Sequence, residues 1–373
     1  MIALGALFLG FVSCRTDAPV LPPEEEKHGD TLRTEIVGFY LLNEGNMGSN
    51  KATLDYYDYT SATYRRNIYP EANPNVAKEL GDVGNDLQIY GSRMYAVINC
   101  SNKVEVMDVH TGQRIGQIDI PNCRYICFDG GYGYVSSYAG PVSLDASHAQ
   151  IGYVARFDTA TLEIRDRCLV GYQPDGVAVA DGKLYVANSG GYMAPDYEST
   201  LSVIDLESFT ETTRIEVAPN LHRLMPDRYH QLWVSSRGDY YDVPSRLYCI
   251  DTRTDRLIDS VEIAVSDMDI AGDSLYLCAT EWSYEEMDDV ISYAIVDVQH
   301  RQMVNRHFIT DGTDEDIRKP YGIKVNPLTH EIFVTDAKNY VTPGALHCYA
   351  SDGSLQWSVR TGDIPAHIAF VKK

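Results

Sequence analysis

A short strand pattern that ends in aspartate recurs along this chain with a nearly constant spacing. Its six copies end at Asp58, Asp108, Asp158, Asp205, Asp251 and Asp297, at intervals of 50, 50, 47, 46 and 46 residues. About 20 residues before most of these aspartates lies a second pattern of apolar and aromatic residues, as in Leu184-Tyr185-Val186-Ala187. A period of this length with several strands per unit is typical of a β-propeller, because one unit cannot bury both faces of its sheet alone.

Each unit divides into four predicted strands. The best-formed unit has strands over 176–180, 183–187, 200–205 and 211–217, and Asp181-Gly182 is the predicted hairpin turn between the first two. The repeated aspartate stands before a turn between the third and fourth strands, where a short polar side chain bonds the backbone locally. We therefore expect a structural role for that aspartate.

The two ends of the chain predict how the ring closes. Six complete units fit between about 85 and 362, and the pattern over 366–371 resembles a lone innermost strand. Near the N-terminus, 38–42, 53–58 and 64–68 resemble a second, third and fourth strand without a first. The sequence thus predicts an all-β, seven-bladed β-propeller over 35–373, closed by a C-terminal strand that joins three N-terminal strands.

The first residues have the features of a bacterial lipoprotein leader. Residues 1–13 are apolar apart from Ser13, and Phe11-Val12-Ser13-Cys14 resembles a lipobox with Cys14 as the lipidated residue. Residues 14–34 are rich in Pro, Glu and Asp, which predicts a disordered tether. The alternative for residues 1–13 is a buried N-terminal strand. Thirteen residues are too few to span a bilayer, so we expect attachment to the membrane by lipid alone.

Charge and cysteine usage narrow the possible partners. The net charge of −22 argues against binding to nucleic acid, whose phosphates would be repelled. Cys100 and Cys123 lie near strand ends of one unit and could pair, whereas five other cysteines fall inside strand patterns as small buried side chains. We expect a monomeric ring.

Sequence motifs for catalysis are missing. The chain has no GxSxG, HExxH or GxxxxGK[ST] motif and no Cys/His cluster with zinc spacing. The acidic loop over 311–316 does not have the spacing of an EF-hand calcium site. The sequence therefore predicts a protein that is not an enzyme and holds no metal or cofactor.

Long aromatic loops predict a binding surface on one face of the ring. Loops between second and third strands, and links between blades, open on the same face, and here they carry Tyr and Trp among polar residues. Such a surface suits a large, flat, uncharged ligand. The candidate ligand-binding residues are Arg124, Tyr138, Asn188, Tyr192, Ser236, Arg237, Tyr241, Trp282, Asp336 and Tyr340.

The segment Leu184-Tyr185-Val186-Ala187-Asn188 resembles the YVTN repeat of surface-layer and YncE-type seven-bladed propellers. Together with the lipobox, the acidic tether and the Tyr-rich loops, the chain looks similar to the BtuG-type surface lipoproteins of Bacteroidetes. That resemblance implies capture of cobalamin at the cell surface and its delivery to a TonB-dependent outer-membrane transporter. In that case cobalamin is a transported ligand, and the protein is lipid-anchored at the outer membrane.

Two other functions remain open at this point. The aromatic loops suit a module that binds a glycan or a protein partner, because sugar rings also stack on Tyr and Trp. A metal-dependent lactonase would need Glu, Asn and Asp ligands converging on the central channel.

Overall fold

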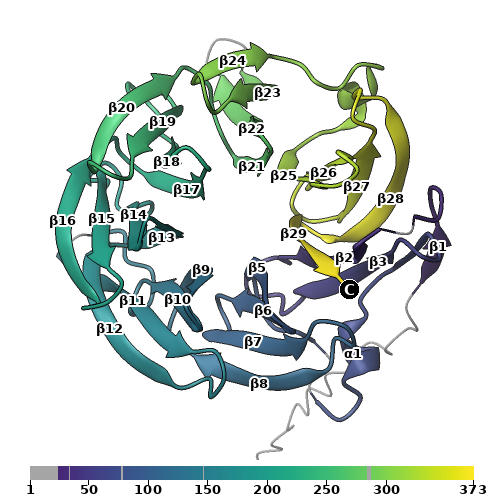
Figure 1. The fold of residues 1–373 in the computed structure, drawn as a ribbon, viewed down its shortest axis with the longest axis horizontal. Helices are drawn as coiled ribbons and strands as arrows, with labels where there is room; N and C mark the ends of the chain where they lie inside the picture. The colour runs from purple at the N-terminus through teal and green to yellow at the C-terminus, as the bar shows by residue number, and fades with distance from the viewer. Residues whose placement is uncertain (1–23, 33, 77–78, 146, 284–286) are drawn as a thin grey trace, which may run out of the picture.

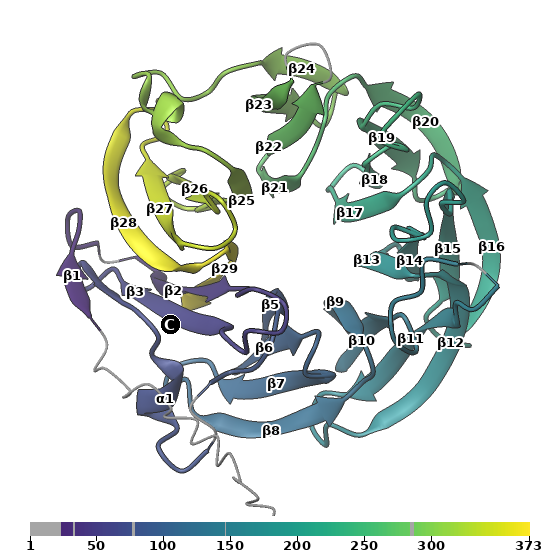
Figure 2. The same cartoon turned by 180° about the vertical axis from the view of Figure 1, so that it is seen from behind.

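Seven antiparallel sheets surround a central channel, as the sequence predicts (Figures 1 and 2). The computed structural model describes residues 24–32, 34–76, 79–145, 147–283 and 287–373. We number the sheets as blades 1 to 7 from the N-terminus. Cys14 and the predicted leader, 1–13, lie outside the described residues.

In each of blades 2 to 7, the four strands follow one another in sequence order from the channel outward. Blade 2 consists of β5 (Gly84–Tyr90), β6 (Arg93–Ile98), β7 (Lys103–Asp108) and β8 (Arg114–Asp119). Blade 3 consists of β9 (Cys123–Asp129), β10 (Tyr132–Ser137), β11 (Ile151–Asp158) and β12 (Ile164–Tyr172). Blade 4 consists of β13 (Pro174–Ala180), β14 (Lys183–Asn188), β15 (Thr200–Asp205) and β16 (Thr210–Glu216).

The second half of the ring repeats this arrangement. Blade 5 consists of β17 (Leu221–Pro226), β18 (Gln231–Ser236), β19 (Arg246–Asp251) and β20 (Arg256–Val261). Blade 6 consists of β21 (Asp267–Ala271), β22 (Ser274–Ser283), β23 (Asp288–Asp297) and β24 (Gln302–Asn305). Blade 7 consists of β25 (Pro320–Val325), β26 (Ile332–Asp336), β27 (Pro343–Tyr349) and β28 (Leu355–Asp363). The links between blades hold the short helix α1 (Tyr69–Ala72) and the 3₁₀ turn η1 (Thr313–Asp316).

Blade 1 closes the ring from both ends of the chain. The innermost strand β29 (Pro365–Lys372) pairs with β2 (Ile36–Asn43), and β3 (Thr53–Asp58) and β4 (Thr63–Arg65) complete the blade. This confirms the predicted closure and leaves no unpaired innermost strand.

A fifth strand covers the outer edge of blade 1 (Figure 1). This strand, β1 (Glu25–Lys27), pairs with β4, and Arg66 forms ion pairs with both Glu24 and Glu26. The described part of the segment that the sequence predicts as a disordered tether is therefore packed on the ring. The strand forms without an apolar pattern because backbone pairing with β4 and the ion pairs of Arg66 hold Glu25–Lys27 in place.

The hydrophobic core is divided among the seven interfaces between neighbouring blades. Each interface holds one cluster of buried side chains. Side chains alternate between the two faces of a strand, so in β6 Met94 and Ala96 pack toward blade 1 while Tyr95 and Val97 pack toward blade 3. The aromatic residue of the repeated second-strand pattern thus fills the interface with the following blade, which explains its recurrence.

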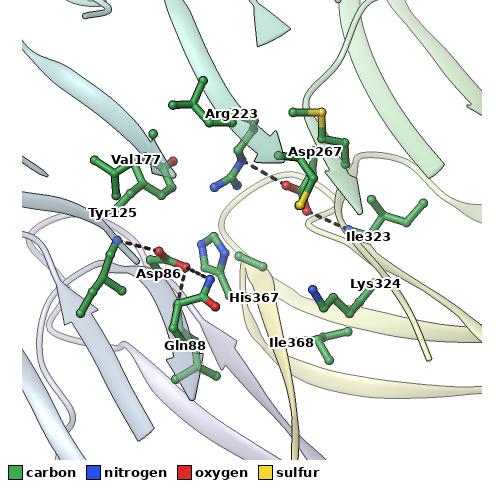
Figure 3. Close-up of a pocket in the computed structure, with 17 residues that line it drawn as sticks. Asp86, Gln88, Tyr125, Val177, Arg223, Asp267, Ile323, Lys324, His367 and Ile368 are labelled. Atoms are coloured by element: carbon green, nitrogen blue, oxygen red, sulfur yellow. Dashed lines mark hydrogen bonds and ion pairs between the residues drawn. The ribbon is translucent and has the colours of Figure 1, made fainter. Parts of the chain in front are cut away.

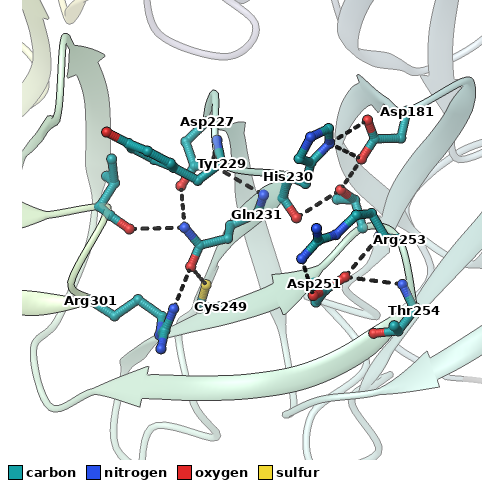
Figure 4. A network of polar contacts seen from close by, with 12 residues as sticks. Asp181, Asp227, Tyr229, His230, Gln231, Cys249, Asp251, Arg253, Thr254 and Arg301 are labelled. Carbon is teal, nitrogen blue, oxygen red and sulfur yellow. Dashed lines mark hydrogen bonds and ion pairs between the residues drawn. The ribbon is translucent and has the colours of Figure 1, made fainter.

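The repeated aspartates fold the turns between third and fourth strands, as predicted. In blade 5, the Asp251 carboxylate accepts hydrogen bonds from the backbone N–H groups of Arg253 (2.9 Å) and Thr254 (3.1 Å) (Figure 4). Burial alone would raise the pKa of the Asp251 carboxyl, but the bonds from Arg253 and Thr254 hold it below its usual value. The aspartate is therefore bound in its ionised form.

We expect Asp251→Ala to lower the free energy of unfolding by about 1 kcal/mol, because two backbone donors lose their acceptor. Asp251→Asn keeps an acceptor oxygen and is the matched control, with a smaller loss. Thermal unfolding followed by circular dichroism measures both variants. Equal melting temperatures for Asp251→Ala and the unchanged chain would contradict a structural role for this carboxylate.

On the face where these turns lie, side-chain contacts also join neighbouring blades. His230 Nδ1 of blade 5 lies 2.8 Å from Asp181 Oδ1 of blade 4, and Arg301 of blade 6 donates to Gln231 of blade 5 (3.2 Å) (Figure 4).

Cys100 and Cys123, which the sequence allows to pair, are both free thiols. Within the residues that the structure describes, no helix is long and apolar enough to cross a bilayer.

Candidate functional site

The candidate site lies on the face formed by the links between blades and the loops between second and third strands, which we call the loop face. In six of the seven blades the innermost strand shifts register against the second strand at this face. Such bulges turn side chains away from the regular pleat. The bulged positions include Arg124, Tyr125, Asp175, His222, Arg223 and Tyr321, and together these residues form the mouth of the central channel.

A buried carboxylate, Asp175, organises one side of this mouth. Its oxygens lie 3.1 Å from Arg124 Nε, 2.9 Å from the Tyr138 hydroxyl and 3.2 Å from Arg237 Nη1. Arg124 also stacks over the Tyr138 ring, with its guanidinium carbon 4.8 Å from the ring centroid. These four residues, which we call the Asp175 cluster, come from three blades, so the cluster fixes the relative positions of side chains that no single strand could place.

Opposite charges hold the Asp175 cluster in one protonation state. Burial alone would raise the pKa of the Asp175 carboxyl, but Arg124 and Arg237 beside it keep that pKa below its usual range. The neighbouring His222 has its pKa lowered well below the usual value, first by burial and then by Arg237 and Arg223. His222 is therefore neutral at pH 7, and the positive charges of the mouth are those of its arginines.

Two further contact groups complete the mouth. The Tyr125 hydroxyl lies 2.8 Å from His222 Nε2, while Arg223 stacks on the Tyr125 ring and forms an ion pair with Asp267. On the far side, the Tyr321 hydroxyl donates to Glu44 at 2.9 Å. The mouth is thus lined by pre-positioned polar groups from six of the seven blades.

Exposed aromatic rings surround part of this mouth. Blades 4, 5, 6 and 7 each present at least one on the loop face: Tyr192 (47% exposed), Tyr240 (55%) and Tyr241 (80%), Trp282 (48%) and Tyr340 (39%). The Tyr192 ring contacts Tyr138 edge-on with centroids 6.4 Å apart, which connects the aromatic arc to the Asp175 cluster. Because exposed Tyr and Trp on a rigid scaffold are typical of binding surfaces, this arc is the part of the loop face best suited to contact a ligand.

A groove of about 1120 Å³ lies between blades 6 and 7. It is lined by the start of β23, the link over 306–319 and the loop after β26, and it carries Arg306, Arg318 and Lys338 beside several carboxylates. The buried Tyr293 hydroxyl has no hydrogen-bond partner among the described residues. The groove is slightly larger than the usual range of small-molecule sites, which is about 300–1,000 Å³.

The structure brings some predicted site residues together and buries three others. Arg124, Tyr138, Tyr192 and Arg237 lie together at the mouth, and Tyr241, Trp282 and Tyr340 extend the arc. Tyr138 is buried, so its hydroxyl positions Asp175.

Asn188, Ser236 and Asp336 are buried at the ends of second strands, with side chains already hydrogen-bonded. Asn188 binds Gly171, Thr200 and Ser202. Ser236 binds Pro219 and Gly238, whereas Asp336 accepts from Lys319 and Lys338. These contacts tie each loop to the chain segment that leads into its blade. Both hydrogen bonds of Asp336 go to Oδ1, and Asp336 also lines the groove between blades 6 and 7. Direct contact of these three residues with a ligand stays a prediction.

The sequence reasoning missed Asp175 itself. Its only local signal is a charged residue between Pro174 and Gly176 at the start of an otherwise apolar strand. Within the described part of the chain, no group of three or more His, Cys, Asp or Glu side chains is placed to hold a metal ion.

The family comparison gives a match over most of the ring. Residues 37–353 match a family described as "Domain of unknown function (DUF5074)". A search of curated proteins finds no match.

Solved structures with the same fold have diverse descriptions. A chain of Kuenenia stuttgartiensis hydrazine synthase is 14% identical with a TM-score of 0.63, over 77% of this chain and 89% of that one. A quinonprotein alcohol dehydrogenase-like protein from Bacteroides thetaiotaomicron is 14% identical with a TM-score of 0.61, over 91% and 79%. The Neurospora crassa Pan2 WD40 domain is 8% identical with a TM-score of 0.51, over 78% and 79%. At these identities the likeness shows the fold alone, and enzymes are among the proteins that share it.

Proposed function

This chain belongs to the DUF5074 family of domains of unknown function, and on that premise we propose that it is a ligand-binding propeller that captures cobalamin on its loop face. One observation supports this proposal most directly. Four consecutive blades each present an exposed aromatic ring beside a mouth in which Asp175 fixes Arg124 and Arg237. A large ligand can therefore contact several rigid groups at once.

The chemistry of the loop face matches that of a corrinoid. A corrin ring offers a broad apolar surface, which Tyr192, Tyr241, Trp282 and Tyr340 can contact, and an edge of amides that forms hydrogen bonds. The phosphodiester of the nucleotide loop is an anion, and Arg237, which keeps a third of its side chain exposed, is the available cation at the mouth. Because these groups are held in place before binding, little conformational entropy is lost on capture.

The proposal includes a place for the protein in the cell. Lipidation at Cys14 would anchor the ring at the outer membrane, on the cell surface, where it would pass cobalamin to a TonB-dependent transporter. In this role the protein acts as a monomer and without catalysis. The strongly acidic surface would direct the ring toward basic patches of a partner.

Calorimetric titration of the full chain with cyanocobalamin tests the proposal. We expect one site with a Kd in the nanomolar range, and substitution of Tyr192, Trp282 or Tyr340 by alanine should weaken binding at least about tenfold each. These rings are exposed, so their removal should leave the melting temperature nearly unchanged.

Leu169→Ala is the matched control, because Leu169 is an exposed apolar residue of β12, the outermost strand of blade 3, three strands from the channel. Its affinity should equal that of the unchanged chain. An absence of heat with cyanocobalamin would remove this ligand. A specific hit on a glycan array would then favour the alternative, since the same rings can stack on sugars.

A further inference from the structure

The central channel holds a polar cavity that begins at the mouth residues Tyr125 and Arg223 (Figure 3). It has a volume of about 110 Å³ and is lined by the innermost strands of all seven blades. The acidic and basic residues of its lining are Asp86, Arg223, Asp267, Lys324 and His367. A cavity with this lining is large enough for a few water molecules or one small polar ligand.

The carboxylates of this channel already accept hydrogen bonds from backbone N–H groups of the innermost strands. Asp86 accepts hydrogen bonds from the backbone N–H groups of Leu87 and Ile126. Asp267 accepts from Ile323, and Asp269 accepts from Val325. Three of these four donors belong to the next blade, so the acidic side chains join neighbouring innermost strands.

The cationic side chains, by contrast, keep spare donors. Arg223 forms an ion pair with Asp267 through Nε at 3.0 Å, but its two terminal amino groups make no hydrogen bond among the described residues. Lys324 donates one hydrogen bond, to Asp269 at 2.7 Å, and an ammonium group has three to give. Arg223 and Lys324 therefore bring N–H donors to the cavity that no described residue accepts from.

A buried histidine points to the same conclusion independently. His367 is only 8% exposed, and its Nε2 atom has no hydrogen-bond partner among the described residues. The nearest acid, Glu44, lies 3.5 Å from this atom and already accepts from Tyr321. Figure 3 shows His367 directed into the cavity between Asp86 and Asp267. A buried polar atom without a partner is costly unless a ligand or water satisfies it.

We propose that this cavity binds a small oxyanion, of the phosphate or carboxylate class, between Arg223, Lys324 and His367. The anion's oxygens would accept from the terminal amino groups of Arg223, from Lys324 and from His367, which reach the cavity from blades 5, 7 and 1. Guanidinium and ammonium donors suit such an anion because charge-assisted hydrogen bonds are the strongest available to it. This site is separate from the aromatic arc and does not depend on the proposed function.

Thermal unfolding of the full chain in inorganic phosphate, in acetate and in sodium chloride of equal ionic strength tests the proposal. We expect phosphate or acetate to raise the melting temperature above its value in chloride, with a saturating dose response. Arg223→Lys keeps the positive charge near Asp267 but removes the terminal amino groups, and should weaken the anion at least about tenfold. Arg228→Lys, on an exposed arginine paired with Asp273, is the matched control and should keep the response.

A crystal of the full chain soaked in selenate locates the anion, because selenium scatters anomalously. An anomalous peak within hydrogen-bonding distance of Arg223 and His367 supports the proposal. Equal melting temperatures in phosphate, acetate and chloride would overturn it, as would an equal loss of response in Arg228→Lys. A cavity that contains only water after the soak would also overturn it.

Discussion

A chain that ends at Ile364, and so lacks β29, is expected to show no cooperative unfolding transition under conditions in which the full chain is folded. β29 pairs with β2 along its whole length, from Ile36 opposite Lys372 to Asn43 opposite Pro365. Its side chains enter both interfaces of blade 1: Ile368 packs toward blade 7, and Ala369 and Val371 pack toward blade 2. Its removal would expose two core clusters and one wall of the central channel to water.

Circular dichroism and calorimetry measure this outcome. A chain that lacks only Lys372 and Lys373 is the matched control, because it keeps the buried part of β29, and it should unfold cooperatively. A peptide with the sequence of residues 364–373, added to the truncated chain, should restore a transition whose midpoint rises with peptide concentration. A truncated chain that melts at the same temperature as the full chain would show that the closure does not hold the ring together.

This closure was predictable because a strand that is buried on both faces has a recognisable run of apolar residues. Every blade needs apolar residues on both faces of its inner strands, so one incomplete set at each end of the chain could be matched to the other. The second-strand aromatic residues recur for the same reason, since each fills the interface with the following blade, as Tyr95 and Trp233 do.

The sequence does not reveal which polar residues form the mouth, because polar residues recur at the same position in several blades. Asn188, Ser236 and Asp336 stand at the position where polar side chains tie loops to links, and Ser137 does the same by donating to Pro121. From the sequence, such residues cannot be distinguished from ligand contacts on neighbouring loops. Their burial is a property of the assembled blade.

Asp175 could not be predicted for a different reason, because it is not part of a repeated pattern. Its partners Arg124 and Arg237 lie 51 and 62 residues away in the chain. No local pattern links these positions, because the contact exists only after three blades have packed around the mouth. The strand β1 escaped prediction for a related reason: its position depends on Arg66, which lies 40 residues from Glu26.

Asp175→Ala is expected to lower the free energy of unfolding by about 3–5 kcal/mol, the usual cost of removing one partner from a buried ion pair. Asp175 is 1% exposed, and without it Arg124 and Arg237 become neighbouring cations with no anion between them, while Tyr138 loses its acceptor. Affinity for cyanocobalamin should fall as well, because the mouth loses the fixed position of Arg237. Asp166→Ala removes the carboxylate of the partly exposed Arg156 pair on outer strand β12 and should cost at most about 1 kcal/mol.

The pH dependence separates this electrostatic role from simple packing. The folded pKa of Asp175 lies below the usual 3.8, so its stabilisation is fully present above that value and is lost as the pH falls through the folded pKa. The stability difference between the unchanged chain and Asp175→Ala should therefore shrink on acidification below about pH 4. In a double-mutant cycle, Arg237→Ala should cost less when Asp175 is already alanine, because it then removes a repulsion from Arg124. Additive costs and a pH-independent difference would mean that Asp175 fills space at the mouth without holding its arginines.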